Sequence, residues 1–229
     1  PPVFEYHRPE SLRESLELLA TLSDAKILAG GQSLMPMMNF RYVMPEHIID
    51  INRLKELAEI KRVHVGIKFG AMARHDQAKK SEIVLEHCPL IAAGMEYVAH
   101  AQIRNRGTIG GSMAHLDPSA EWPALLAVHD ATLHVQSSSG ERDVPILEWS
   151  QGFMAPNLAE DEMLTDITVA TWPAKHVYGF AELARRKGDF ALAGAAVLLD
   201  FDGEVISRAA LALMGVEVGP VRMIDAETY

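Results

Sequence analysis

Two glycine-pair turns constrain the fold of this chain more than any other feature. The first reads Ala29-Gly30-Gly31-Gln32-Ser33 and the second Thr108-Ile109-Gly110-Gly111-Ser112. Each follows an apolar run typical of a strand. Glycine lets the backbone approach a ligand closely, and successive N–H groups in such a turn form a cradle for anions. Two turns of the same kind predict one extended ligand that carries a pyrophosphate and is held from two sides.

Neither turn matches a standard nucleotide-binding loop. The first lacks the G-x-G-x-x-G pattern that opens a helix, and no Gly-Lys-Ser/Thr follows it. One interpretation is that the N–H groups of Gly30 to Ser33 hold phosphate oxygens and that the Ser33 hydroxyl adds a donor. The other is a tight strand-to-loop turn that needs a positive φ. Taken alone, the first turn leaves both open.

The second turn lies in a polar stretch between Gln102 and Pro123, within a chain that is otherwise apolar. Ordered polar loops of this kind contact ligands more often than they form cores. The side chains of Arg104 and Arg106 are candidates to neutralise phosphate or to orient the loop through carbonyl groups. Glu121 is a candidate acceptor for the hydroxyls of a ribose.

Hydrolytic and metal-dependent chemistry find little support. Ser112, His115 and Asp117 lie too close in sequence for a typical triad, and no G-x-S-x-G pattern surrounds Ser112. We expect His115 to be a hydrogen-bonding loop residue. The ten histidines are scattered, without an H-E-x-x-H spacing, so the sequence predicts no metal site.

The amino-acid composition and the net charge disfavour several classes of protein. The 229 residues are 48% hydrophobic, which is enough for a sizeable core, and the formal charge of −10 disfavours nucleic acid or an anionic membrane as partner. No apolar run reaches the ~20 residues that span a bilayer, and the first residues show no signal peptide. The single cysteine, Cys88, excludes an internal disulfide or a cysteine-ligated cluster and is expected to be buried. We therefore expect a soluble, cytoplasmic protein.

Local patterns predict a small α/β unit over about residues 1–55. Ser11-Leu12-Arg13-Glu14 reads as a capping box, and Leu12, Leu16 and Leu19 fall on one helical stripe. Short strands are predicted from Lys26 to Ala29 and from His47 to Ile51. Together with the flanking helix they form one compact unit.

The rest of the chain divides into a helical and an antiparallel part. The segment 63–67, extended to 72, alternates as a strand does, and residues 76–101 predict two helices split by Pro89. A helix begins near Glu121, and a hairpin covers 132–146. After Trp172-Pro173 the predicted strands are 177–183, 191–201 and 205–214, with a turn at Asp202-Gly203 and no evident closing helix.

Several of these motifs resemble the FAD-binding medium subunit of the molybdenum hydroxylases. This family includes the carbon monoxide dehydrogenase medium chain and the flavin domain of xanthine dehydrogenase. The resemblance covers about residues 3–225, and members usually continue for some tens of residues past Tyr229. It rests on Phe4-Glu5-Tyr6-His7-Arg8-Pro9, Ala29-Gly30-Gly31-Gln32-Ser33-Leu34, Arg104-Asn105-Arg106-Gly107-Thr108-Ile109-Gly110-Gly111, Asp117-Pro118 and Arg185-Arg186-Lys187-Gly188-Asp189-Phe190-Ala191.

The resemblance implies an α+β fold. Its first part is a two-subdomain FAD-binding domain of the vanillyl-alcohol-oxidase (PCMH) type over residues 1–174, with subdomains of about 1–55 and 56–174. A small antiparallel C-terminal domain follows over residues 175–229 and looks incomplete.

It also implies the FAD-binding residues. The backbone of 29–33 and 108–112 would hold the pyrophosphate, Glu121 would lie near the adenosine ribose, and Leu164 and Phe190 would lie near the isoalloxazine ring. Some relatives place a lysine near the flavin where this chain has Ala181-Glu182, which leaves open whether Lys187 takes that role. The full expected set is Ala29, Gly30, Gly31, Gln32, Ser33, Leu34, Thr108, Ile109, Gly110, Gly111, Ser112, His115, Asp117, Glu121, Leu164, Lys187, Asp189 and Phe190.

The function implied is electron transfer, with no catalytic acid or base on this chain. A large molybdenum-cofactor subunit and a small [2Fe-2S] subunit would be its partners in a heterotrimer or a pair of such heterotrimers, and an external acceptor would receive the electrons. Two alternatives stay open: a self-standing FAD-dependent oxidase or dehydrogenase, and a binding protein that keeps the fold without FAD.

Overall fold

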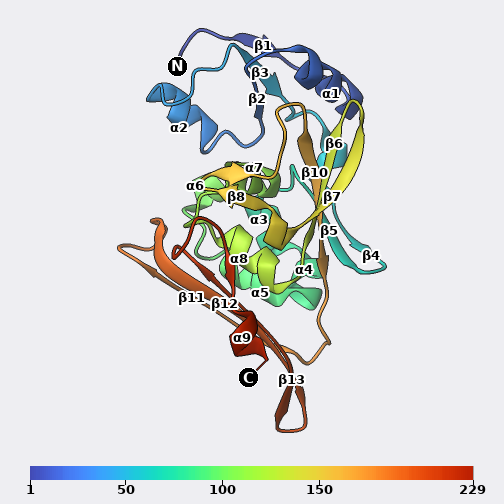
Figure 1. Cartoon of the computed structure of the whole chain (residues 1–229), viewed down its shortest axis with the longest axis vertical. Helices are drawn as coiled ribbons and strands as arrows, with labels where there is room; N and C mark the ends of the chain where they lie inside the picture. The colour runs from blue at the N-terminus through green and yellow to red at the C-terminus, as the bar shows by residue number, and fades with distance from the viewer. Residues whose placement is uncertain (229) are drawn as a thin grey trace.

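The computed structural model describes residues 1–228 as three stacked units, with the N-terminus at one end and the C-terminus at the other (Figure 1). A small parallel sheet forms the first unit. A layer of helices then lies between a five-stranded antiparallel sheet and a four-stranded antiparallel sheet. This mixture of helices and sheets confirms the predicted α+β class.

The N-terminal unit is a three-stranded parallel sheet in the order β1-β3-β2. Helix α1 begins where predicted, because the Ser11 hydroxyl accepts from the Glu14 N–H at 3.2 Å. The Glu14 carboxylate accepts from the Glu10 N–H rather than from Ser11, so the predicted capping box is shifted by one residue. Leu16 and Leu19 share a core cluster with Ile49. The elements are β1 (Glu5–His7), α1 (Leu12–Thr21), β2 (Ala25–Leu28), α2 (Leu34–Asn39) and β3 (His47–Asp50).

The five-stranded sheet is antiparallel throughout and contains two features that the sequence did not predict. The segment 63–67 is not one strand, because a turn at His64-Val65 folds it into a hairpin. Residues 163–170 form the central strand, whose apolar and polar residues do not alternate because nearly all of them are buried. In order, the strands are β4 (Ile60–Val63), β5 (Gly66–Gly70), β10 (Met163–Ala170), β6 (Thr132–Ser137) and β7 (Gly140–Pro145).

Short helices cover this sheet. Pro89 begins a helix as predicted, but Ser81 breaks the region once more, so three helices replace the expected two. No helix among residues 1–228 combines the length and the apolar character needed to cross a bilayer. The helices are η1 (Lys55–Ala58), α3 (His75–Lys80), α4 (Glu82–His87), α5 (Pro89–Gly94), α6 (Ala101–Arg104), α7 (Ile109–His115), α8 (Glu121–Val128) and η2 (Ile146–Glu148).

The C-terminal unit is the predicted antiparallel sheet, in the order β11-β12-β13-β14. Helix α8 packs between this sheet and the rest of the molecule, which buries all its residues from Trp122 to Val128. A short closing helix follows, which the sequence did not predict. The elements of this unit are β11 (Val177–Ala184), β12 (Ala191–Asp202), β13 (Val205–Met214), β14 (Val221–Arg222) and α9 (Ile224–Glu227). A separate two-stranded sheet, formed by β8 (Ser150–Gly152) and β9 (Ala155–Pro156), precedes β10 in the chain.

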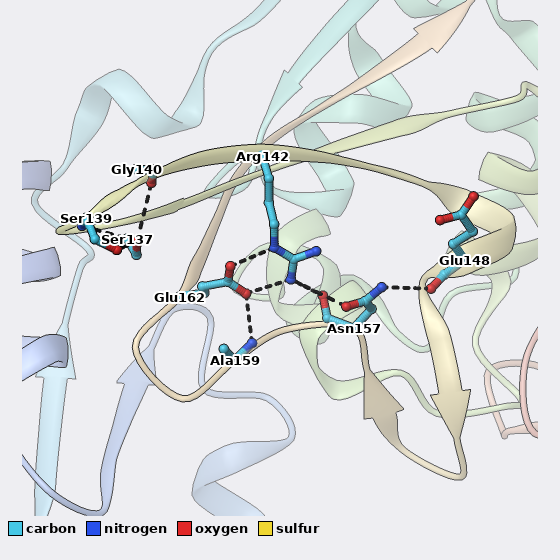
Figure 2. A network of polar contacts seen from close by, with 8 residues as sticks. All are labelled: Ser137, Ser139, Gly140, Arg142, Glu148, Asn157, Ala159 and Glu162. Atoms are coloured by element: carbon cyan, nitrogen blue, oxygen red, sulfur yellow. Dashed lines mark hydrogen bonds and ion pairs between the residues drawn. The ribbon is translucent and has the colours of Figure 1, made fainter.

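A polar network ties the β6–β7 hairpin to the segment that leads into β10 (Figure 2). The Arg142 guanidinium donates to both carboxylate oxygens of Glu162 at 2.6 Å and to the Asn157 carbonyl at 3.0 Å. Glu162 also accepts from the Ala159 N–H at 2.8 Å. Paired donors of this geometry form strong, directional hydrogen bonds, so the network fixes how the chain enters the central strand.

Gly66, the first residue of β5, gives a test of the close pairing between β5 and β10. An added Cβ at Gly66 would lie 1.9 Å from the Val169 carbonyl oxygen on the neighbouring strand, whereas one at Gly140 would meet nothing within 4 Å. We expect Gly66→Ala to lower the free energy of unfolding by about 1–3 kcal/mol, because the strands must separate. The matched control Gly140→Ala should change it by less than ~0.5 kcal/mol in urea denaturation. Equal effects of the two changes would contradict this close approach of β5 to β10.

Candidate functional site

The first glycine turn leaves a run of backbone donors unused. It connects β2 to α2, and Gly31 has a φ of +73°, which favours glycine. Within residues 1–228, the N–H groups from Gly30 to Leu34 donate no hydrogen bond. The Ser33 side chain does not cap α2 either. Because most backbone N–H groups in proteins are paired, five free donors in succession mark a place for an external acceptor such as phosphate.

The second glycine turn differs from the expectation. It follows helix α6 rather than a strand, and its glycines lie in the first turn of α7 without a positive φ. Thr108 caps this helix. Four N–H groups already donate inside the chain: Ile109 to Ala73 O, Gly110 to Ala71 O, Gly111 to Thr108 Oγ1 and Ser112 to Thr108 O. These four N–H groups therefore do not offer the free donors that the first turn does, and the place of this turn in an FAD site stays a prediction.

The two turns nevertheless face each other. An added Cβ at Gly30 would lie 2.4 Å from the Arg106 carbonyl oxygen and 2.8 Å from Gly107 Cα. One at Gly111 would lie 3.9 Å from Ala29 Cβ. Glycine at position 30 is required by this close approach, and the second turn thus supplies a wall beside the free donors of the first.

Asn52 and Arg74 clamp the turns together, and nothing in the sequence had singled them out. The Asn52 amide donates to the Ala29 carbonyl at 2.8 Å, and its oxygen accepts from the Arg74 guanidinium at 2.7 Å. Arg74 also donates to the Arg106 carbonyl. One signal was available for Asn52, since it lies two residues after the strand that ends at Asp50.

The imidazole of a neutral histidine, His75, packs against the backbone of the second turn. His75 is 6% exposed, and its Nδ1 accepts from Trp122 Nε1 at 2.8 Å. An added Cβ at Gly107 would lie 2.7 Å from this imidazole. Burial, reinforced by Arg74 and Arg104, lowers the pKa of His75 to about 4. The ring is therefore uncharged at neutral pH and can accept the indole hydrogen bond.

Three carboxyl groups, those of Asp117, Glu121 and Glu182, lie near one another beyond the C-terminal end of α7. Burial raises the pKa of Glu121 to about 7, and the nearby Glu182 and Asp117 contribute to the rise. The pKa of Glu182 is also raised by burial, and its Oε2 is buried without a partner among the described residues. Arg104 donates to the carbonyls of Val98 and Ala99, as one of its predicted roles required, yet its Nε is likewise unpaired. Unpaired buried polar atoms indicate an external polar partner.

His115 and Asp117 lie at the end of α7. His115 is the last residue of the helix, which corrects its predicted place in a loop, and burial lowers its pKa. Leu116 then turns the chain with a φ of +50°, and Asp117 Oδ1 accepts from the Ser119 N–H at 2.8 Å. Asp117 is thereby used to shape the loop.

The predicted residues nearer the C-terminus are more dispersed. Leu164 is 4% exposed within β10, whereas Phe190 is 72% exposed in the loop before β12. Asp189 is exposed, and its N–H donates to the Arg186 carbonyl at 3.1 Å. A cavity of about 740 Å³ lies beside Glu182 and Lys187, and its other lining residues include Glu96, Tyr97, Tyr178 and Phe180.

Two known protein families match this chain. The family described as "FAD binding domain in molybdopterin dehydrogenase" matches residues 2–172, and the "CO dehydrogenase flavoprotein C-terminal domain" matches residues 178–229. These matches confirm the predicted fold, in which an FAD-binding domain precedes an antiparallel one.

Individual relatives cover nearly the whole chain. The 6-hydroxypseudooxynicotine dehydrogenase complex subunit alpha of Paenarthrobacter nicotinovorans is 40% identical and aligns with 99% of this chain and 77% of its own length. The carbon monoxide dehydrogenase medium chain of Hydrogenophaga pseudoflava is also 40% identical, over 94% of this chain and 76% of its own. The crystal structure of quinoline 2-oxidoreductase from Pseudomonas putida 86 superimposes with a TM-score of 0.95 at 38% identity, covering 100% of this chain and 79% of that one.

The neutral state of His75 predicts an acid sensitivity. An unfolded chain protonates this ring near pH 6.5, whereas the folded chain resists protonation until about pH 4. The contribution of His75 to the free energy of unfolding is thus complete above pH 6.5 and falls as the pH drops towards 4. Between pH 7 and pH 5 we expect a loss of about 2 kcal/mol.

Urea denaturation at the two pH values measures this loss. His75→Gln removes the titrating ring, so its stability should change less between pH 7 and pH 5 than that of the unaltered protein. An equally large change in both proteins would show that other groups cause the acid sensitivity.

Proposed function

The chain belongs to the FAD-binding medium subunits of the molybdenum hydroxylases, which are FAD-containing oxidoreductase subunits, and we propose that it passes electrons from [2Fe-2S] clusters of a partner subunit to an external acceptor. The observation that carries this proposal is the run of free N–H donors from Gly30 to Leu34 beside the wall formed by the second turn.

These donors fit the pyrophosphate of FAD. Phosphate oxygens accept hydrogen bonds from backbone N–H groups without the need for a fixed positive side chain. Gly111 faces Ala29 across the two turns, since an added Cβ there would lie 3.9 Å from the Ala29 Cβ, and it also packs closely on its own helix cap, since that Cβ would lie 2.7 Å from Thr108 Oγ1. We assign the pyrophosphate to the free N–H donors of the first turn, with the Ser33 and Ser112 hydroxyls as additional donors.

The remaining parts of FAD are assigned by the resemblance and by the unpaired polar atoms. Glu121 would accept from the ribose hydroxyls, which would relieve the cost of its burial. Arg104 Nε and Glu182 Oε2 offer a donor and an acceptor to a polar ring edge. We propose the same full set of cofactor-binding residues as the sequence predicts, including Leu34, His115, Asp117, Leu164, Lys187, Asp189 and Phe190.

When bound, FAD supplies both one-electron and two-electron redox chemistry, and the protein supplies binding and orientation. The single cysteine in the sequence leaves no ligand set for an iron–sulfur cluster here. We therefore propose that a small partner carries the [2Fe-2S] clusters and a large partner carries the molybdenum cofactor and hydroxylates the substrate. The names of two relatives, one a complex subunit and the other a medium chain, support a multi-subunit assembly.

Three further assignments are also proposals. The subunits would form a heterotrimer in the cytoplasm. The chain would divide into an FAD-binding domain over 1–174, with subdomains of about 1–55 and 56–174, and a C-terminal domain over 175–229. The matched ranges 2–172 and 178–229 support that boundary.

Gly30→Ala tests the location of the pyrophosphate. The added methyl group would collide with the Arg106 carbonyl and separate the two turns. We expect FAD affinity to fall by about 1–3 kcal/mol, which is roughly five-fold to 150-fold. Flavin absorbance after gel filtration and titration of the flavin-free protein measure the effect. Gly152→Ala, whose Cβ would meet Ala155 Cβ at 3.8 Å, serves as the control. Unchanged FAD affinity in Gly30→Ala would contradict this assignment.

The electron path requires the intact complex. We expect copurification with iron and molybdenum, which separates the proposed subunit from a self-standing flavin oxidase. After anaerobic reduction by dithionite, stopped-flow mixing with oxygen, NAD⁺ or a quinone analogue should reoxidise the native complex. A complex stripped of FAD should keep reduced clusters at least ~10-fold longer, because its outlet for electrons is missing. Equally fast reoxidation without FAD would refute the proposed direction of electron flow.

A further inference from the structure

Two histidines and a glutamate lie together on the N-terminal sheet, and none of them belongs to the FAD site proposed above. Glu5 and His7 are two residues apart on β1, so their side chains point to the same face. His47 begins β3 and pairs directly with Glu5 in the parallel ladder. We call these three residues the Glu5–His7–His47 cluster. Sequence spacing predicted no metal site, because His47 lies 40 residues beyond His7 and only the strand pairing brings them together.

The ligand atoms of the cluster converge. His7 Nε2 and His47 Nδ1 are 3.1 Å apart, and the Glu5 carboxylate oxygens lie 3.9 Å from the first and 3.7 Å from the second. One ligand atom from each of the three residues can be chosen so that all three lie within 4.8 Å of one another. The two histidine side chains are only 16% and 18% exposed, whereas that of Glu5 is 68% exposed. The imidazoles are therefore held in place by the sheet, and the carboxylate is free to move.

This arrangement fits a divalent transition metal. Tetrahedral Zn²⁺ with bonds of about 2.0–2.1 Å places its ligand atoms about 3.3 Å apart, close to the observed separation of the two nitrogens. The exposed carboxylate needs to shift by only about half an ångström to complete the set. Two imidazoles and one carboxylate are a donor set that binds Zn²⁺, and similar sites leave a fourth position for water.

We propose that the Glu5–His7–His47 cluster binds one Zn²⁺ per chain and fastens the N-terminal strand β1 to β3. Strand β1 has three residues and lies at the edge of its sheet, so few backbone hydrogen bonds hold it. On its other face Tyr6 donates to Asp50 at 2.5 Å. On the face of the cluster, the 3.1 Å hydrogen bond between His7 Nε2 and His47 Nδ1 joins the same two strands, and a bound metal would replace it with two metal–nitrogen bonds.

Strand β3, which carries His47, connects the Glu5–His7–His47 cluster to the first glycine turn. Asp50 accepts from the Asn52 amide at 2.7 Å, and the same amide donates to the Ala29 carbonyl. The strand that carries Asp50 is β3, which the metal would fix to β1. Zinc would therefore stabilise the sheet from which the first turn projects, and its role is structural rather than catalytic. This inference is independent of the function proposed above.

Zinc binding is tested on the untagged complex, freed of metal by a chelator and dialysed against a defined Zn²⁺ concentration. We expect one equivalent of zinc to remain per chain in elemental analysis and the midpoint of thermal unfolding to rise. His47→Ala and His7→Ala should each weaken zinc binding at least ~10-fold in competition with a chromophoric chelator. His64→Ala, which removes an exposed histidine in the β4–β5 turn, should bind zinc as the unaltered protein does.

Two further measurements keep the proposal falsifiable where a histidine variant folds poorly. Glu5→Gln changes an exposed side chain, so it should keep normal FAD content while weakening zinc binding. X-ray absorption at the zinc edge of the unaltered complex should show two imidazole nitrogens in the first shell. Zinc that dialyses away, that is insensitive to all three substitutions, or that has no imidazole ligands would overturn the site.

Discussion

The hydrogen bonds from Arg74 and Asn52 to backbone carbonyls are the interaction on which the site depends. They join a turn of the N-terminal parallel sheet to a loop that packs on the five-stranded sheet, so they connect two units with separate cores. Burial and the neighbouring Arg106 lower the pKa of Arg74, yet a guanidinium stays charged in proteins. The site therefore contains a permanent positive charge behind its backbone donors, which suits an anionic ligand.

The two glycine turns have different structural roles despite their similar sequences. In the first, the backbone N–H groups are free, and Gly30 allows contact with the opposite loop. In the second, the N–H groups are used to start a helix, and Gly110 allows that helix to lie against Ala71, whose Cβ would be 2.5 Å from an added methyl group. Glycine thus permits ligand approach at one turn and close internal packing at the other. A glycine pair alone does not distinguish these roles.

Much of the fold could be predicted because its signals are local. Ser11 and Pro89 mark helix starts through their own backbone chemistry, and Asp202-Gly203 marks a hairpin through its turn preference. The central strand β10 could not be predicted in this way. Asp166 and Thr165 interrupt its apolar pattern, and they are buried only because Lys68 and the backbone of β6 provide partners from distant segments. The turn at His64-Val65 also lacks the residues that usually identify a hairpin.

The residues of the candidate site fall into the same two groups, those that local motifs reveal and those that only the fold brings together. Motifs in the sequence pointed to the glycine turns, to Arg104 and to Glu121, because glycine and charged residues in a polar loop are visible locally. Three further residues, Asn52, Arg74 and His75, act through hydrogen-bond partners that lie 22 or more residues away in the sequence. Glu182 has a raised pKa because the fold buries its carboxyl group. A ligand site needs both kinds of residue: local motifs supply the donors, and the fold supplies the charge state and spacing that make them usable. The neutral His75 illustrates this, since its Nδ1 can accept the Trp122 hydrogen bond only while burial keeps the ring unprotonated.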